Sequence, residues 1–389
     1  MTAHRNRVLM LLENCSYPRD TRVRHEAEAL AQQGYRVSVV CPNAGGQTRR
    51  ETIGGVRVYR FPKLPEGNSG SGYVREYLCA AAAIFALSLI VFVREGVDIV
   101  HAHNPPDVFF LLAPVIRLWG VRFVYDHHDL APELYYARFG GGSRLVHDLL
   151  LLCEILSCRA ADRVIVTNES YRDLAQTRAR VAPDRISIVR NGPDETGDSC
   201  EEAHSEVVIA YAGSVGFQDG VDHLLRTLRC LISDFGRTDF RCVLMGDGDA
   251  LATVERLASE LDLQGRIEFR GWVQPEEVGE ALRRCDICVA PEPRNPYNDR
   301  STMIKVLEYM AAGKPIVAFD LIEHRRSADD AALYAQPNDV RDFARQIAIL
   351  IDDPALRQRM GDIGRRRIAE EFAWRHQAPH LLEAYAQIT

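Results

Sequence analysis

The chain lacks the features that mark secreted, disulfide-bonded or nucleic-acid-binding proteins. Its 389 residues carry a formal net charge of −7. This argues against a nucleic acid as the main partner, because phosphate backbones are bound chiefly by lysine and arginine. Ten cysteines in a chain of this length are not a disulfide framework, and no secretory signal precedes the first expected strand. We therefore expect a cytoplasmic protein.

A complete cysteine metal motif and a membrane-spanning run are also missing. Cys285 and Cys288 form a close pair, but there is no second pair to complete a zinc site. The most apolar segment, Leu78–Val93, is shorter than the roughly 20 residues that a membrane span needs. We interpret this segment as a buried helix, and the alternative is a helix that lies on a membrane surface.

Two series of short β-branched runs, each alternating with helical patterns, predict parallel sheets built from βαβ units. The expected strands of the first series are Val8–Leu12, Val37–Cys41, Val56–Phe61, Asp98–Ala102, Arg122–Asp126, Arg163–Thr167 and Ile186–Val189. Those of the second are Val207–Ala212, Arg241–Met245, Arg266–Arg270, Ile287–Ala290, Pro315–Phe319 and Ala332–Tyr334, with helices such as Ala250–Leu261 and Pro275–Cys285 between them. The fold class is therefore α/β, with two Rossmann-like, doubly wound domains of about six strands each facing a cleft.

The domain boundaries follow from a polar stretch between the two series. Asp194–Glu206 has no apolar periodicity and predicts a linker, which places the domains at residues 1–195 and 196–370. The last segment, 371–389, has apolar residues at helical spacing, and we expect it to pack back across the domains. Two glycine-rich segments, Glu66–Gly72 and Arg138–Ser143, are expected to be mobile loops of the first domain. We favour plain surface loops, and the alternative is that they gate the cleft.

Ligands of doubly wound sheets bind beyond the carboxyl ends of the strands, and the segment Ser301–Phe319 gives the strongest local signal there. Ser301 can cap a helix whose free N–H groups attract an anion. Lys305 adds a full charge that could reach a diphosphate, and Glu308 on the same face could accept hydrogen bonds from a ribose diol. Gly313 ends the helix. The alternative is that Lys305 and Glu308 form an ordinary surface ion pair.

Three expected strands of the second series end in small residues. Gly213-Ser214 follows the first strand, Gly246-Asp247-Gly248-Asp249 the second, and Gly271-Trp272 the third. Small residues at these points let the backbone come close to a ligand. Each signal is weak alone, but their order and spacing together favour a binding site.

With these motifs the sequence resembles the family 4 glycosyltransferases, which have the GT-B fold and transfer a sugar from a nucleotide-sugar with retention of anomeric configuration. The resemblance covers essentially the whole chain. It is carried in the first domain by YPRDTRVRHEAEALAQQGYRVSVV, DIVHAHNPPD, YDHHDLAPELY and VRNGPD, and in the second by YAGSVGFQDGVD, MGDGDALATVERLASELDLQGRIEFRGWV and EYMAAGKPIVA. It implies an enzyme that needs no bound metal and no cofactor, with a nucleotide diphosphate-sugar as co-substrate.

The resemblance identifies Glu308 as the second glutamate of the family's E-x7-E motif, which holds the donor. Arg300 replaces the first glutamate of that motif. Many relatives carry an arginine and a lysine on the donor phosphates where this sequence has Ser214 and Asp219. The predicted donor-binding residues are Gly213, Ser214, Gly246, Gly271, Trp272, Ser301, Thr302, Lys305 and Arg294, beside Glu308.

The loss of two cations opposite a diphosphate would cost roughly 1.5–3 kcal/mol each. We expect that the charge has moved elsewhere, rather than that donor binding has been abandoned. Lys305 is one substitute. The others are Arg19, Arg22 and Arg24, which begin a helix that Asp20 can cap and are free to face the cleft, and Arg294 and Arg300 at the second-domain site.

Histidines and aspartates gather after two neighbouring strands of the first domain: His101, His103, Asp107, His127, His128 and Asp129. One interpretation is a metal site, because these residue types are good ligands, whereas the resemblance implies transfer without metal. For His101 and His103 the alternative is structural hydrogen bonding at the strand ends. The resemblance identifies His128, rather than His127, as the contact to the transferred sugar. The expected catalytic residues are His128, Asp129 and Glu308, and the expected acceptor-side residues are Asp20, Arg22, Arg24, His103, Asp107 and Asn191.

The function implied is a retaining hexosyltransferase of polysaccharide, glycolipid or glycosylated natural-product biosynthesis. Positioned cations would stabilise the leaving nucleoside diphosphate. One alternative is a sugar-nucleotide epimerase or hydrolase of the same fold, with Asp129 or Asp107 as base, and another is a catalytically inactive nucleotide-sugar-binding protein. The segment Leu78–Val93 favours a lipid-linked acceptor and peripheral contact with the inner face of a membrane, over a polysaccharide or small-molecule acceptor.

Overall fold

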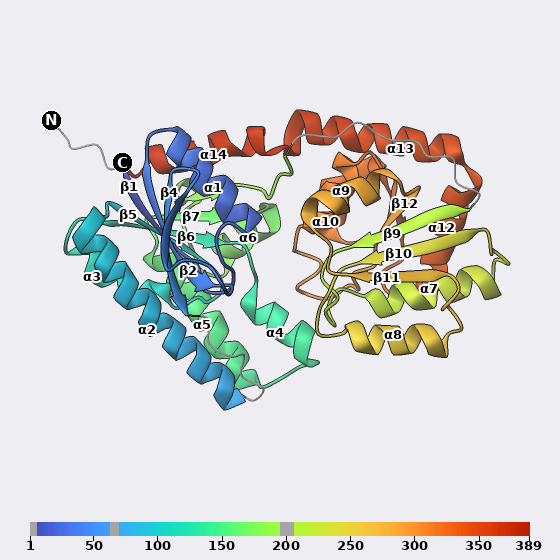
Figure 1. Ribbon diagram of the computed structural model, residues 1–389, viewed down its shortest axis with the longest axis horizontal. Coiled ribbons are helices and arrows are strands. Elements are labelled where there is room, and N and C mark those ends of the chain that lie inside the picture. The colour runs from blue at the N-terminus through green and yellow to red at the C-terminus, as the bar shows by residue number, and fades with distance from the viewer. Residues whose placement is uncertain (1–5, 63–69, 195–205) are drawn as a thin grey trace. The chain divides into compact units, whose positions relative to one another are not determined.

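The computed structural model describes residues 6–62, 70–194 and 206–389, and it divides into two α/β units (Figure 1). The first unit comprises the chain up to Pro132, Ser143–Arg190 and Gln377–Thr389. The second comprises Glu133–Gly142 and Asn191–His376. Each unit is built on one sheet with helices packed on it. The prediction of two Rossmann-like sheets is thereby confirmed.

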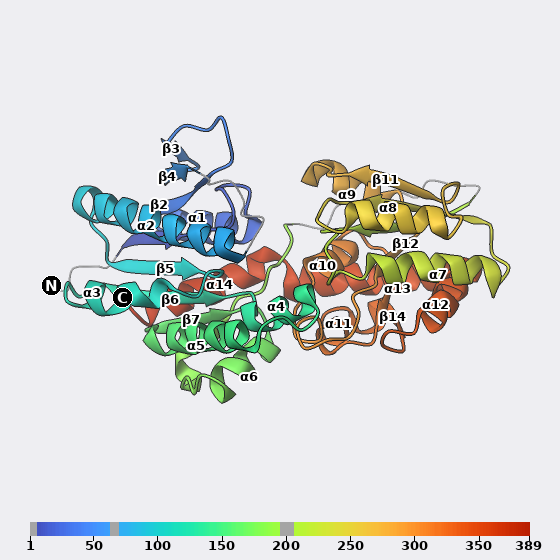
Figure 2. The same cartoon turned by 90° about the horizontal axis from the view of Figure 1, so that it is seen from below.

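The sheet of the first unit has eight strands in the order β3-β4-β2-β1-β5-β6-β7-β8 (Figure 2). All neighbours are parallel except β3 and β4. The strands are β1 (Arg7–Leu11), β2 (Arg36–Asn43), β3 (Arg50–Ile53), β4 (Val56–Pro62), β5 (Ile99–His103), β6 (Arg122–His127), β7 (Arg163–Val166) and β8 (Ile186–Ile188). The sequence missed β3, whose four residues RETI show no clear apolar alternation because this edge strand is only partly covered. The expected number of about six strands is therefore too low for this unit.

Helices cover both faces of this sheet. They are α1 (Thr21–Gln32), α2 (Gly70–Glu95), α3 (Ala113–Arg117), α5 (Arg144–Ala160), α6 (Glu169–Thr177), the 3₁₀ turns η1 (Phe109–Leu112) and η2 (Pro183–Arg185), and the end of α14 (Trp374–Ala386). The expectation of a first-domain loop at Arg138–Ser143 is corrected in two respects: Arg138 and Phe139 are the last residues of α4 (Ala131–Phe139), and Glu133–Gly142 belongs to the second unit. As predicted, Asp20 caps α1 by accepting a hydrogen bond from the backbone N–H of Val23 at 3.0 Å.

The helix α2 corrects the expectation of a buried helix at Leu78–Val93. Ile84 and Val91 are buried, but Phe85, Leu89 and Val93 are 51%, 62% and 77% exposed. One side of α2 packs on the sheet and the other side remains open, which an all-round apolar composition cannot reveal. Among the residues described, none of the helices is both long and apolar enough to cross a membrane. Of the expected loop Glu66–Gly72, residues 66–69 lie outside the described residues, and Gly70 already begins α2.

The second unit has six parallel strands in the order β11-β10-β9-β12-β13-β14, as many as the sequence predicts. They are β9 (Val207–Ala212), β10 (Phe240–Met245), β11 (Ile267–Gly271), β12 (Ile287–Ala290), β13 (Ile316–Phe319) and β14 (Ala332–Ala335). In β9 successive side chains enter two different hydrophobic clusters. Ile209 and Tyr211 pack in one, and Val208 and Ala210 pack in the other. This alternation shows that both faces of the sheet are covered.

The helices of the second unit are divided between these two faces. They are α7 (Val221–Ser233), α8 (Leu251–Glu260), α9 (Pro275–Arg283), α10 (Ile304–Ala311), α11 (Ile322–Ala328), α12 (Val340–Asp352), α13 (Pro354–Arg367), the 3₁₀ turn η3 (Asp329–Ala331) and the π-helical turn η4 (Ile368–Phe372). Figure 1 shows α7 and α8 on one side of the strands and α9 and α10 on the other. Leu224, Leu225, Leu228 and Leu231 give α7 the apolar stripe that it buries against the sheet.

The chain returns to the first unit at Gln377. There the hydroxyl of Tyr385 lies 2.9 Å from His101 Nδ1, and its ring meets Tyr35 edge-on at 5.6 Å between centroids. The predicted helix at the C-terminus is thus present as α14, and its last turns help to enclose the core of the first unit.

Gly361 in α13 gives a test of the packing in the second unit. A Cβ atom at this position would lie 2.1 Å from the carbonyl oxygen of Gly313. We predict that Gly361→Ala destabilises the second unit by about 1–3 kcal/mol, because the backbone clash outweighs the roughly 1 kcal/mol of helix propensity that alanine adds. Urea unfolding of both variants checks this. Gly265→Ala, which would meet no atom within 4 Å, serves as the control, and equal midpoints for the two variants would contradict the clash.

Candidate functional site

Three loops that follow β9, β10 and β11 are hydrogen-bonded to one another beyond the strand ends. The N–H of Gly213 donates to the carbonyl of Met245 at 3.0 Å, and the N–H of Gly246 donates to the carbonyl of Gly271 at 2.8 Å. The N–H of Val215 donates to the carbonyl of Asp247 at 3.0 Å. The hydrogen-bond pattern of the parallel sheet therefore continues beyond the strand ends. It fixes the backbone of the predicted glycine-rich segments.

Glycine is required where two of these loops touch. Gly246 has a φ of +154°, and a Cβ atom on it would lie 1.8 Å from the carbonyl oxygen of Gly213. Gly213 has a φ of +151°, and a Cβ atom there would lie 2.7 Å from Lys305 Cε. No other residue type fits either position without moving the backbone or the lysine.

These loops form one wall of a cavity of about 430 Å³ in the second unit. The other walls come from α9 and α10. Its lining includes five of the predicted residues: Gly213, Ser214, Gly246, Trp272 and Glu308. It also includes Asp247 of the predicted glycine-rich motif, and residues that were not predicted for the site, among them Pro193, Val278, Leu282 and Arg283. The cavity size lies within the roughly 300–1,000 Å³ of small-molecule sites.

Arg283 is a cavity-lining residue that was not predicted from the sequence. It lies in the last turn of α9 and lines the cavity, together with Val278 and Leu282 from the same helix. In the sequence, Arg283 and Arg284 are adjacent at the end of a helical pattern. This pattern does not show which of the two arginines faces the cavity.

The cavity has two acidic lining residues, Asp247 and Glu308. Glu308 lies on α10, and desolvation by the surrounding protein raises the pKa of its carboxyl group above the usual value, while Lys305 lowers it. Gly313, with a φ of +69°, stands just after Ala312, where α10 ends, as the sequence predicts.

Lys305 does not line the cavity. Its ammonium group is buried behind Gly213, 2.5 Å from Glu292 Oε1 and 2.8 Å from the hydroxyl of Tyr211. Asp219 is 4.0 Å away. Burial alone would lower the pKa of Lys305, but Glu292 outweighs it, so the pKa is raised and the amine stays charged. In this arrangement Lys305 neutralises carboxylates of its own unit.

The remaining residues of the predicted donor site lie beside the cavity. Ser301 does not cap α10, whose N-cap is Met303, and its hydroxyl donates instead to the carbonyl of Tyr297 at 2.9 Å. The hydroxyl of Thr302 donates to Glu323 Oε2 at 3.3 Å. Arg294 donates to the carbonyl of Asp320, and Arg300 to the carbonyl of Pro296. Loop geometry around Asn295, which accepts two backbone hydrogen bonds, sets these positions.

A second polar cluster lies in the first unit, around Asp126 at the end of β6. Arg22 on α1 binds both oxygens of this carboxylate, at 2.7 and 2.9 Å. His103 Nδ1 lies 2.9 Å and His128 Nδ1 lies 3.5 Å from it. Burial alone would raise the pKa of Asp126, but Arg22, His128 and His103 together outweigh it and hold the pKa well below the usual range. Asp126 therefore stays ionised at the centre of the cluster, and the sequence analysis did not single it out.

The expectation that Arg22 is free to face a ligand is wrong. The side chain is buried, and besides Asp126 it contacts the carbonyl of Val189 at 2.9 Å and Glu26 at 3.2 Å. The neighbouring residues Arg19 and Arg24 are more exposed. Asp20 accepts the capping hydrogen bond of α1, so its first role is structural.

The two adjacent histidines occupy different environments. His127 is fully buried between the rings of Tyr125 and Tyr171. His128 is partly exposed, and its backbone N–H donates to Asn104 Oδ1 at 2.8 Å. Burial alone would lower the pKa of His128, but the carboxylate of Asp126 outweighs it and raises the pKa. Of the two, only His128 can present a charged imidazole to a ligand.

His101, His103, Glu26 and Asp126 come within 4.8 Å of one another and have the residue types of a metal site. Both His103 Nε2 and Glu26 are buried without a hydrogen bond. The guanidinium of Arg22 already supplies the positive charge of this cluster, which disfavours a divalent cation beside it. Burial raises the pKa of Glu26 and lowers the pKa of His101, so both tend to be neutral.

Asp107 is enclosed in the first unit. It accepts a short hydrogen bond from the hydroxyl of Tyr125, and burial raises the pKa of its carboxyl group to about 6. Asp129 is half-buried beside His128, and its N–H donates to Asn104 Oδ1 at 3.0 Å. Asn191, expected in the first domain, begins a segment that belongs to the second unit.

Comparison with known proteins agrees with this geometry. Residues 20–192 match the family model described as the glycosyl transferase 4-like domain, and residues 206–353 match the model of the glycosyl transferases group 1. The 2-deoxystreptamine glucosyltransferase of Streptomyces kanamyceticus is 25% identical, with 93% of this chain and 97% of that protein covered. The D-inositol 3-phosphate glycosyltransferase of Corynebacterium kroppenstedtii is 26% identical, with 81% and 73% covered.

Solved structures share the fold at lower identity. Sucrose-phosphate synthase from Thermosynechococcus elongatus superposes with a TM-score of 0.79 at 18% identity, and 99% of both chains is covered. Anabaena HepE in complex with UDP and glucose gives a TM-score of 0.74 at 14% identity, with 98% of this chain and 99% of that chain covered. Two consecutive family matches, the shared fold and the cavity at the expected strand ends lead to one conclusion. The chain belongs to the group 1, family 4 glycosyltransferases of the GT-B fold, which take the transferred sugar from a nucleotide-sugar donor.

Proposed function

We propose that the protein is a retaining, metal-independent hexosyltransferase that uses a uridine diphosphate sugar. The observation that carries this is the cavity of the second unit, which unites Glu308, Trp272 and the glycine loops. UDP as the nucleotide is supported by HepE, whose structure contains UDP and glucose. Formation of free UDP only when an acceptor is present would support transfer. Release of UDP without acceptor would favour the epimerase or hydrolase, and absence of any turnover would favour a binding protein.

Each wall of the cavity suits one part of such a donor. Trp272 is 59% exposed and offers an aromatic face to the base. The carboxylate of Glu308 accepts hydrogen bonds from ribose hydroxyls. The loops at Gly213 and Gly246 bring backbone to the cavity wall, where its N–H groups can meet the diphosphate.

The charge that many relatives place near Ser214 has a different source in this proposal. Lys305 is committed to Glu292 and Tyr211, whereas Arg283 lines the cavity itself. We assign to Arg283 the charge-assisted hydrogen bonds that hold the diphosphate. Lys305 then acts indirectly, by neutralising Glu292 and Asp219, whose charges would otherwise repel the donor.

Nucleotide titration tests this assignment. Calorimetry with UDP, GDP, ADP and dTDP should show saturable binding, tightest for UDP. We predict that Glu308→Ala and Arg283→Gln each weaken UDP binding by about tenfold or more, because each removes a charge-assisted hydrogen bond. Arg284→Gln is the matched control, since its side chain lies outside this cavity, and it should leave the affinity unchanged. Equal affinity for Arg283→Gln and the wild type would refute the role of Arg283.

The sugar transfer requires stabilisation of the leaving diphosphate. We propose that His128, as an imidazolium, donates a hydrogen bond to the donor sugar or its phosphate during this step, and that Asp126 holds the ring and its charge. This is electrostatic catalysis by a preorganised group, and such donors contribute roughly 10²–10³-fold. Asp129 is proposed to assist on the acceptor side.

A pH profile tests the roles of His128 and Asp126. The pKa of His128 is raised by Asp126, so the charged form is present at low pH and is lost as the pH rises through this pKa. We predict that His128→Gln lowers kcat by about 10²-fold. Asp126→Asn should move the alkaline limb of the profile to lower pH. Thermal unfolding, measured in parallel, reports that each variant is folded, and an unchanged alkaline limb in Asp126→Asn would contradict this proposal.

We also propose that the acceptor is lipid-linked and that the protein reaches it from a membrane surface. An apolar surface on α2 and the turn after α3 consists of Phe85, Leu89, Val93, Leu118 and Trp119, which are 51–82% exposed. Phe92 and Trp119 meet edge-on with their centroids 5.8 Å apart, which joins α2 and this turn into one surface. Exposed apolar patches of this kind support binding to a lipid interface.

Vesicle sedimentation tests the lipid contact. Vesicles of phosphatidylcholine mixed with phosphatidylglycerol should pellet the wild type. We predict that the double variant Leu89→Ser/Val93→Ser lowers the vesicle partition coefficient by about tenfold or more. The reason is that two aliphatic side chains, which would be buried in the lipid interface, are lost. Ile349→Ser, at an exposed apolar position on α12 of the second unit, is the control. A double variant that pellets like the wild type would exclude this surface.

A further inference from the structure

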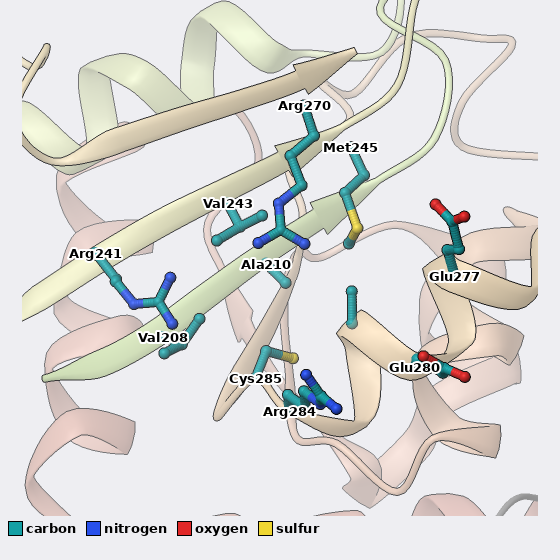
Figure 3. Close-up of a pocket in the computed structure, with 11 residues that line it drawn as sticks. Val208, Ala210, Arg241, Val243, Met245, Arg270, Glu277, Glu280, Arg284 and Cys285 are labelled. Atoms are coloured by element: carbon teal, nitrogen blue, oxygen red, sulfur yellow. The ribbon is translucent and has the colours of Figure 1, made fainter. Parts of the chain in front are cut away.

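The second unit contains another cavity, of about 290 Å³, between α9 and the face of β9, β10 and β11 (Figure 3). Its floor is apolar and is formed by Val208, Ala210 and Val243. Three arginines line it, namely Arg241, Arg270 and Arg284. None of these residues belongs to the predicted donor site.

The charges of this cavity are unevenly distributed. Arg241 and Arg270 share a single carboxylate, that of Glu268, at 3.9 and 2.7 Å. Two further carboxylates, Glu277 and Glu280, stand on α9 across the cavity from Arg241 (Figure 3). One side of the cavity is therefore cationic, and the other side offers acceptors for hydrogen bonds.

We propose that this cavity binds a phosphorylated sugar or polyol as a second, regulatory ligand. The arginines bind the phosphoryl group, since guanidinium groups match its geometry with charge-assisted hydrogen bonds. Glu277 and Glu280 accept hydrogen bonds from the hydroxyls. The volume lies at the lower end of small-molecule sites, which suits a ligand of this size better than a whole nucleotide-sugar.

The second cavity shares its wall with the donor cavity. Met245 lines both. The helix α9 turns one face, with Glu280, Ala281 and Arg284, to the second cavity, and the opposite face, with Leu282 and Arg283, to the donor cavity. A ligand that shifts α9 therefore changes the donor cavity. Because linkage is reciprocal, the donor nucleotide and the ligand change each other's affinity by the same factor.

Calorimetry with glucose 6-phosphate in the presence of saturating UDP tests the proposal, because UDP keeps the phosphate out of the donor cavity. The expected result is saturable binding that glucose and an equal ionic strength of sodium chloride do not reproduce. Arg241→Gln combined with Arg270→Gln should weaken it by roughly tenfold or more. Arg284→Gln alone is the second variant and should weaken it as well. Thermal unfolding confirms that both are folded.

The controls separate this site from the donor site and from unspecific attraction. Arg256→Gln, on α8 at the other face of the sheet, should leave glucose 6-phosphate binding unchanged, and so should Glu308→Ala measured without UDP. Binding that is lost in Glu308→Ala, or lost equally in Arg256→Gln, would overturn the proposal. Binding no stronger than that of glucose would also overturn the proposal. In that case the aliphatic parts of the arginine side chains only cover the apolar face of the sheet.

Discussion

The contact between the backbones of Gly213 and Gly246 is the constraint on which the cavity of about 430 Å³ depends. Two parallel strands end at the same edge of the sheet, and their loops touch only because Gly246 carries no Cβ atom, which would lie 1.8 Å from the carbonyl oxygen of Gly213. A Cβ atom on Gly213 would instead lie 2.7 Å from Lys305 Cε. A side chain at Gly246 would therefore separate the loops that hold Ser214 and Asp247 at the cavity wall, and one at Gly213 would displace Lys305.

Buried cations organise the interiors of both units. Arg22 binds Asp126 in the first unit, and Lys305 binds Glu292 in the second. Each lies near the start of a helix and pairs with a carboxylate at or just beyond the end of a strand, Asp126 of β6 and Glu292 after β12. Breaking such a pair would leave an uncompensated buried charge, which costs several kcal/mol. From the sequence both cations were predicted to bind the ligand. The sequence does not show whether the partner of a lysine or arginine in a motif is a phosphate or a distant carboxylate.

Local sequence signals predicted the elements well wherever the decisive interactions are local. Asp20 caps α1 and Gly313 follows the end of α10, because a cap or a left-handed residue acts within one turn of the chain. Ser301 fails as a cap because its hydroxyl donates to the carbonyl of Tyr297, four residues earlier in the loop around Asn295, an irregular local structure that no simple motif signals. The strand β3 escaped prediction because its pairing with β4, and not its composition, makes it a strand.

The sequence by itself determined the two parallel sheets, the order of their strands along the chain and the glycine loops that end three of them. It also placed Glu308 and Trp272 at the cavity of about 430 Å³, because the carboxyl ends of parallel strands converge whatever the details of packing. The family resemblance already favoured His128 over His127. Only the tertiary structure decided that Arg283, and not Arg284, lines this cavity. It also decided which side of α2 is open. The physical reason is that neighbours in sequence point to different sides of an element, and what covers each side comes from residues far away in the chain.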